Sequence, residues 1–269
     1  MTTIGLKGAS GLGDTILAYP IVKYYADRYD VVYYMTDYPE LYETLRNVVC
    51  SKHEKVNYIN IRGGIKHPVN IRFTYCGRKY TEGTSQFQDT CMSAGVPKTL
   101  ECKIDWTIKN KQNDYRNDKP VCVLSAPYEP FGREDQWGKL LRINNDVMDA
   151  IVESYKDRVD FVQIGNKYTL YKVPNVKHDL VNKTSVSDLM DIVSTCDIGL
   201  SQIGNLLPMC EALGKKSFTI FSKKALMCDN KFLNSITPDK VVHDRSKNCS
   251  IIDDDIDNAV RKFGETINL

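Results

Sequence analysis

Short hydrophobic runs and amphipathic stretches alternate along the whole chain. The hydrophobic runs predict strands at Thr2–Lys7, Val31–Met35, Val56–Ile61, Val121–Ser125, Val159–Ile164, Ile198–Ser201 and Lys216–Phe221. Apolar residues at helical spacing predict helices at Thr15–Asp27, Pro39–Val48, Ser85–Ala94, Ile143–Tyr155, Ser187–Cys196, Leu207–Leu213 and Ile251–Phe263. Because strands alternate with helices, an α/β fold with mostly parallel sheets is expected.

Two such alternating series are separated by the polar segment Asn110–Lys119, which ends at Pro120. We therefore expect two Rossmann-like lobes facing a central cleft. The first lobe is predicted over residues 1–117 and the second over residues 118–250. Residues 251–269 are predicted as a C-terminal helix, capped by Ser250, which can pack back on the first lobe.

The composition is that of an ordinary globular protein, with 42% hydrophobic and 26% charged residues among 269. No apolar run approaches the roughly 18 residues of a membrane span, and the start of the sequence lacks a signal-peptide pattern. A cytoplasmic protein without integral membrane contact is expected. The nine cysteines form no C-x-x-C pair and the four histidines lack ligand spacing, so reduced, mostly buried thiols and no metal site are expected.

The net charge of +2 is unevenly distributed. From Arg46 to Arg116 there are 13 Lys/Arg against 6 Asp/Glu, a local +7 that leaves −5 for the rest. Such a segment indicates an anionic partner if its charges converge, and an ordinary solvated surface if they do not.

A glycine-rich loop follows the first predicted strand, with Gly8, Gly11 and Gly13 ahead of Asp14. Free backbone N–H groups at such a helix start favour an anion. The spacing does not match the dinucleotide fingerprint G-x-G-x-x-G, which disfavours an NAD-dependent reductase. Taken alone, Asp14 fits a helix cap that accepts backbone N–H bonds.

The stretch that contains Lys7, Gly13, Asp14, Leu17 and Pro20 resembles the opening of the heptosyltransferase-like (GT9-type) glycosyltransferases, which have the GT-B fold. The resemblance implies that Asp14 is the catalytic base that deprotonates an acceptor hydroxyl. An alcohol needs such a base to become nucleophilic near neutral pH.

The second half carries the more specific part of the resemblance, from Lys183 to Phe221. It implies a nucleotide-sugar donor, with a diphosphate at the helix start Gly204–Leu207 and a ribose at Glu211; a solvated helix residue is the alternative for Glu211. The donor-binding residues implied are Arg133, Lys139, Gly165, Gly204, Asn205, Leu206, Leu207 and Glu211. The chain departs from the family at Ile203–Pro208, where polar donor contacts are usual, and this disfavours an ADP-heptose donor.

The acceptor is expected in the first lobe, at Gly11, Gly13, Arg62, Lys66, Arg72, Arg78 and Lys79. The basic side chains alternate with Phe73, Tyr75 and Tyr80, a combination that also holds nucleic acid. The resemblance thus predicts an inverting glycosyltransferase that uses a nucleotide sugar and needs no obligatory cofactor. A hydroxymethylated DNA base is the slightly preferred acceptor, as in phage DNA modification within the host cytoplasm. A lipopolysaccharide or other surface glycan is the alternative, and a nucleotide-sugar epimerase or a non-catalytic binding protein is the alternative of another class.

Overall fold

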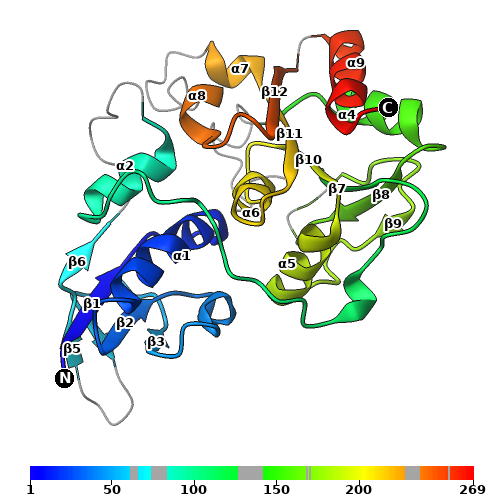
Figure 1. Cartoon of the computed structure of the whole chain (residues 1–269). Coiled ribbons are helices and arrows are strands. Elements are labelled where there is room, and N and C mark those ends of the chain that lie inside the picture. The colour runs from blue at the N-terminus through cyan, green and yellow to red at the C-terminus, as the bar shows by residue number, and fades with distance from the viewer. Residues whose placement is uncertain are drawn as a thin grey trace. The chain divides into compact units, whose positions relative to one another are not determined.

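The computed structural model describes residues 1–60, 66–73, 84–126, 142–167, 169, 171–227, 237–253 and 255–269. The chain divides into two compact units, Met1–Trp106 and Thr107–Leu269 (Figure 1). The sequence predicts this boundary after residue 117, eleven residues later.

The first unit is built on a parallel sheet of four strands in the order β3-β2-β1-β6. The strands are β1 (Thr3–Lys7), β2 (Val31–Met35), β3 (Val48–Ser51) and β6 (Ile71–Arg72), and β4 (Tyr58–Asn60) and β5 (Lys66–Pro68) form a separate antiparallel pair. The helices are α1 (Leu12–Ala26), the 3-10 turn η1 (Pro39–Tyr42) and α2 (Gln86–Ser93). The strand order reverses between β1 and β6, which is where ligands bind in open α/β sheets.

Helix α1 contains Pro20, whose missing N–H and fixed φ disturb the helix one turn earlier. The buried Tyr42 phenol donates to the Thr15 carbonyl at 2.7 Å, close to this point. Helix α2 forms as predicted, because Ser85 and Gln88 make a reciprocal capping box and Gly95 adopts a φ of +71° just beyond its end.

The second unit has one parallel sheet of six strands in the order β12-β11-β10-β7-β8-β9. The strands are β7 (Val121–Ser125), β8 (Asp160–Ile164), β9 (His178–Asp179), β10 (Ile198–Gln202), β11 (Lys216–Phe221) and β12 (Asn248–Ile252). The helices are the 3-10 turn η2 (Lys111–Asn113), α4 (Asn145–Tyr155), α5 (Val186–Thr195), α6 (Leu206–Ala212), α7 (Lys223–Leu226), α8 (Pro238–Val241) and α9 (Ile256–Ile267). This is the Rossmann order, with its reversal between β7 and β10.

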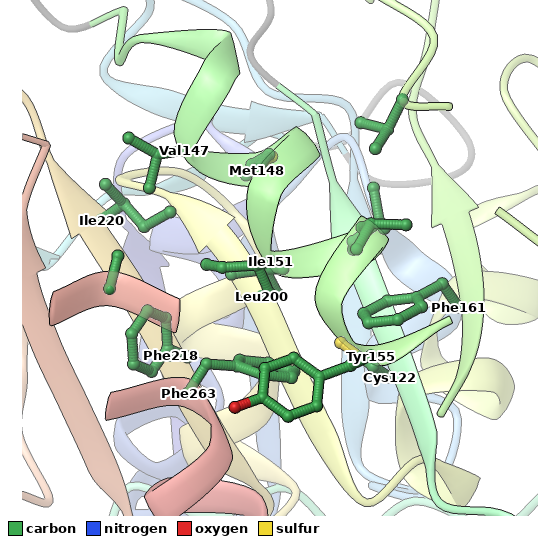
Figure 2. Close-up of a cluster of buried hydrophobic side chains, with 14 of the residues drawn as sticks. Cys122, Val147, Met148, Ile151, Tyr155, Phe161, Leu200, Phe218, Ile220 and Phe263 are labelled. Atoms are coloured by element: carbon green, nitrogen blue, oxygen red, sulfur yellow. The ribbon is translucent and has the colours of Figure 1, made fainter. Parts of the chain in front are cut away.

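The last helix, α9, belongs to the core of the second unit. Phe263 is fully buried, with ring centroids 5.4 Å from Tyr155 of α4 and 5.5 Å from Phe218 of β11 (Figure 2). Gly264 fits because a Cβ there would lie 2.2 Å from the Tyr155 hydroxyl oxygen. The buried face of this helix packs within the second unit, and a contact with the first lobe stays a prediction.

Two predictions of secondary structure are wrong. The expected helix Pro39–Val48 is a 3-10 turn followed by β3, because the β-branched pair Val48–Val49 pairs with β2. The expected cap Ser250 lies in β12, which pairs with β11, and α9 instead begins after Asp255, whose side chain accepts the Asn258 N–H.

Of the cysteines in the described ranges, Cys91, Cys102, Cys122, Cys196 and Cys210 are buried, and each is a free thiol. Burial raises the pKa of the Cys91 and Cys196 thiols to about 12, so they stay protonated and unreactive.

Candidate functional site

Asp14 lies in the first turn of α1, the helix that follows β1. The strand order of the first sheet reverses beside this strand. The helix begins after Gly11, so Asp14 is inside the helix and is not its cap residue. The carboxylate turns back toward the glycine loop, because a Cβ at Gly11 would lie 2.7 Å from the Asp14 Oδ2 atom. Asp14 is half-buried, and a negative charge at this end of a helix is favourable.

Two tyrosines share the environment of Asp14. Burial, to which the Asp14 charge adds, raises the pKa of the Tyr34 and Tyr38 phenols. Both phenols therefore stay neutral over the physiological pH range. The Tyr34 oxygen also reaches the glycine loop, because a Cβ at Gly8 would lie 2.9 Å from it.

Side chains that follow β2 and β3 brace the glycine loop. The His53 Nε2 atom lies 3.1 Å from the Gly8 carbonyl oxygen, to which the Nε2–H tautomer donates. The His53 backbone N–H donates to Asp37 Oδ1 at 3.4 Å. Lys7, at the end of β1, donates to the carbonyl of Val56 at 3.1 Å. His53 and Asp37 were not identified from the sequence. Asp37 follows the predicted strand β2, and His53 follows β3 of the same sheet.

The predicted acceptor residues lie only partly within the described residues. Lys66 stacks over the Tyr58 ring at 4.4 Å, and Arg72 donates to the Asn57 side chain. Both thus contact their own segment, and a role with an acceptor stays a prediction. Gly11 and Gly13 lie at the start of α1, and Arg62, Arg78, Lys79, Tyr75 and Tyr80 lie outside the described residues.

Phe73 does not line a groove as the sequence analysis expects. It is buried and stacks against Tyr34, with ring centroids 6.3 Å apart. Its aromatic face is therefore used in the core of the first unit.

In the second unit, the predicted diphosphate loop precedes α6, a helix of seven residues. Asn205 adopts a helical conformation there and makes no side-chain cap bond. Leu206 and Leu207 are buried, so their side chains do not face solvent, whereas Asn205 is exposed. Gly165, at the end of β8, is packed beneath Thr169, whose Oγ1 would lie 2.3 Å from an added Cβ, and Arg133 and Lys139 lie outside the described residues.

Glu211 has a structural function that the sequence did not predict. Its side chain is buried, and its Oε1 accepts the backbone N–H groups of His243 at 2.6 Å and Asp244 at 3.0 Å. It also accepts from the Asn248 side chain at 3.3 Å. Glu211 is therefore not a solvated helix residue, and a contact with a ribose stays a prediction.

Burial raises the pKa of Glu211 to about 7 from the usual 4.5, against the opposing effect of the two backbone N–H bonds. Between these two pKa values, the folded state binds more protons at Glu211 than the unfolded state does. The contribution of Glu211 to the free energy of unfolding is therefore lost as the pH rises through this range. Glu211→Gln keeps an acceptor oxygen and removes the charge. Relative to the wild type, its unfolding free energy is expected to rise by about 3 kcal/mol between pH 4.5 and 8, measured by urea denaturation. Parallel pH curves for the two proteins would contradict the prediction.

A pocket of about 750 Å³ opens at the carboxyl edge of the second sheet, between the starts of α4 and α7 and the end of β12. Asp253 joins these elements, because its carboxylate accepts the backbone N–H of Asn144 at 3.0 Å and of Lys223 at 2.8 Å. Three cationic side chains line the pocket together with Asp146 and Asp253: Arg142, Lys223 and Lys224.

This pocket has the composition of an anion-binding site. Among the lining residues that the structure describes, three cations against two carboxylates leave a net positive charge, and the Asp253 carboxylate accepts two backbone N–H groups. The first backbone N–H groups of α4 add a positive dipole end. Sequence reasoning missed these cations, because they come from segments about 80 residues apart that only the strand order brings together.

Among the residues that the structure describes, no group of three or more His, Cys, Asp or Glu side chains could hold a metal ion. Within the same ranges, no helix combines the length and the apolar character needed to cross a bilayer.

Comparison with solved structures identifies the fold. The chain is similar to the E. coli ADP-heptose lipopolysaccharide heptosyltransferase II, with a TM-score of 0.65 and 11% identity over 100% of this chain and 99% of that one. It is also similar to a family 9 glycosyltransferase from Veillonella parvula, with a TM-score of 0.62 and 11% identity over 99% and 89% of the two chains. A third neighbour is E. coli heptosyltransferase WaaC with ADP, with a TM-score of 0.57 and 12% identity over 98% and 97%.

At the level of sequence, no protein-family model and no characterised protein matches the chain. The structural likeness confirms the predicted α/β fold of the GT-B heptosyltransferase type.

Proposed function

We propose, from the fold that this chain shares with the heptosyltransferases, that the protein transfers a sugar from a nucleotide-activated donor to a hydroxyl group of an anionic surface glycan. The observation that carries the proposal is the likeness to heptosyltransferase II over both chains' full length, combined with a carboxylate, Asp14, at the strand-order reversal of the first sheet.

The proposed reaction is a single displacement. The acceptor oxygen attacks the anomeric carbon while the bond from that carbon to the donor's phosphate oxygen breaks, and the nucleoside diphosphate leaves with the bonding electron pair. Asp14 takes the proton of the acceptor hydroxyl, and the anomeric configuration inverts. The glycine loop, braced by His53, supports the start of the helix that carries Asp14.

The donor is proposed to bind at the carboxyl edge of the second sheet. The cations Arg142, Lys223 and Lys224 neutralise the diphosphate, whose charge rises as it departs. The backbone N–H groups before α6 lie at the strand-order reversal of the same sheet and are the second candidate for phosphate contact.

For the acceptor, a lipopolysaccharide-type glycan is proposed rather than a DNA base. The similar heptosyltransferase II acts on lipopolysaccharide, as its name states. Of the predicted acceptor-binding cations, Lys66 and Arg72 lie within the described residues, and they contact Tyr58 and Asn57.

The proposal is tested by measuring nucleoside diphosphate release from a panel of nucleotide sugars. Each donor is offered with phosphorylated lipopolysaccharide core, with DNA containing hydroxymethylcytosine, or alone. Release that depends on the lipopolysaccharide core is expected. Release that depends on the DNA would establish a DNA base as the acceptor. If no donor released its nucleoside diphosphate, the proposal that the protein is a glycosyltransferase would be overturned.

The cationic pocket makes a separate prediction. Arg142→Ala is expected to weaken binding of the donor nucleotide by about 10–100-fold, the value of a charge-assisted contact to phosphate. Isothermal calorimetry with the nucleoside diphosphate measures it. Arg158→Ala is the matched control, because Arg158 is exposed just beyond the opposite end of the same helix. If Arg142→Ala bound the nucleoside diphosphate as tightly as the wild type, the loop before α6 would be the phosphate site instead.

A further inference from the structure

A carboxylate lies in the pocket where the proposed donor site needs positive charge. Asp253 lines this cationic pocket of the second unit together with Arg142, Lys223 and Lys224. A carboxylate at this place repels a diphosphate and, by its charge alone, weakens the binding of the donor. The hydrogen bonds of Asp253 indicate a different function.

The backbone of Asp253 is fixed by the sheet. Strand β12 pairs in parallel with β11 as far as Ile252, which lies opposite Phe221. The Asp253 N–H then donates to the Phe221 carbonyl at 3.0 Å. This bond places Asp253 at the carboxyl edge of the sheet, close to the point where the chain leaves β11 and enters α7.

The side chain of Asp253 connects two elements that are far apart in the sequence. Its Oδ1 atom accepts the backbone N–H of Lys223, the first residue of α7, at 2.8 Å. Its Oδ2 atom accepts the backbone N–H of Asn144, the residue before α4, at 3.0 Å. Hydrogen bonds to an ionised acceptor are roughly twice as strong as those between neutral groups. Each oxygen of this carboxylate therefore holds one wall of the pocket.

The starts of α7 and α4 are otherwise weakly held. Ser222, at the cap position of α7, makes no side-chain bond to the start of that helix. Ahead of α4, the buried Gln202 of β10 accepts the Ile143 N–H at 3.4 Å, which is long for a hydrogen bond of this kind. Asp253 therefore gives α7 a side-chain attachment and gives α4 the shorter of these two attachments.

We propose that Asp253 is a positioning residue that holds Arg142 and Lys223 on the walls of one pocket, so that both cations meet the diphosphate of the donor. Arg142 lies two residues before Asn144, and Lys223 is itself the other residue that Asp253 holds. Charges that are fixed in advance stabilise a departing diphosphate well, because they need no reorganisation during the reaction. The inference rests on the proposed donor site and adds the residue that shapes it.

Two substitutions in the same pocket separate positioning from charge. Asp253→Asn and Asp146→Asn each remove one negative charge from the lining, and charge alone would tighten the binding of a nucleoside diphosphate by about 2–5-fold in both. Asp253→Asn also keeps only one acceptor oxygen, so one wall is released. It is therefore expected to weaken the binding by about 10-fold, whereas Asp146→Asn, at an exposed position, is expected to tighten it.

Isothermal calorimetry with ADP, UDP, GDP, CDP and dTDP measures these affinities. If the wild type bound one of them and Asp253→Asn bound it as tightly or more tightly, Asp253 would not be a positioning residue, and the donor site would stand. If the wild type bound none of them, the donor site itself would be wrong, and with it the function of Asp253 toward a diphosphate.

Amide hydrogen exchange followed by NMR tests the two attachments without any nucleotide. Asp253→Asn is expected to speed the exchange of the Asn144 amide or the Lys223 amide by about 10-fold, and Asp253→Ala is expected to speed both. The amides of β10 in the same spectra report whether the fold is intact. Unchanged exchange of both amides in Asp253→Ala would overturn the proposal.

Asp253→Glu covers the case in which the other two variants fail to fold. Glutamate keeps the charge and moves the carboxylate by one methylene group. Because a positioning residue depends on where its oxygens lie, Asp253→Glu is expected to bind the nucleoside diphosphate several-fold more weakly than the wild type. Equal affinity in Asp253→Glu and the wild type would mean that Asp253 acts through its charge alone.

Discussion

Replacing Asp14 by asparagine is expected to lower sugar transfer by about 10²–10⁴-fold, the usual contribution of a positioned general base. Asparagine has nearly the same shape as aspartate but cannot accept the proton of the acceptor hydroxyl. The fold is expected to survive, because the charge at the start of α1 contributes only about 0.3–1 kcal/mol. The measurement is the rate of nucleoside diphosphate release with saturating donor and acceptor.

Two controls separate this effect from a structural one. Asp27→Asn makes the same change at the opposite, exposed end of α1, and it is expected to leave the rate unchanged. Donor affinity in Asp14→Asn is also expected to match the wild type, because the proposed phosphate contacts lie in the second unit. If Asp14→Asn retained its rate within a few-fold, Asp14 would only stabilise the helix start.

The fold was predictable from the sequence wherever a hydrophobic run is long and continuous. The bounds of β2, β7 and β11 agree with prediction to the residue. β2 and β7 are almost uniformly apolar, and β11 carries the buried apolar residues Phe218, Ile220 and Phe221. The prediction failed where tertiary contacts determine the secondary structure. The Asn47 side chain donates to the carbonyls of Ala26 and Tyr29 at 2.7 and 2.9 Å. These contacts hold the turn that directs the chain into β3, and no local sequence pattern reveals them.

The candidate site was predictable only where one short segment carries it. Asp14 and its glycine loop are contiguous, so their placement follows from a strand that runs into a helix. The pocket cations Arg142 and Lys223 are not contiguous, and their meeting depends on the strand order β12-β11-β10-β7. Strand order is a global property of the sheet, and the sequence pattern does not encode it locally.

Replacing Phe263 by alanine is expected to destabilise the second unit by about 3–5 kcal/mol, the usual cost of removing a buried aromatic side chain. The ring contacts Tyr155, Phe161 and Phe218, with centroids 5.4, 6.2 and 5.5 Å away. Its loss leaves a cavity between α9, α4 and the sheet, in the cluster that Figure 2 shows. Native-state hydrogen exchange of the strand amides measures the change in each unit separately.

The distribution of the effect tests where α9 belongs. Protection is expected to fall in β7, β8 and β11 and to stay the same in β1 and β2, because the described contacts of Phe263 all lie within the second unit. Ile256→Ala on the exposed side of the same helix is the control and is expected to cost less than about 0.5 kcal/mol. A loss of protection in β1 and β2 as large as in β7 would mean that α9 also supports the first unit, as the sequence pattern alone allows.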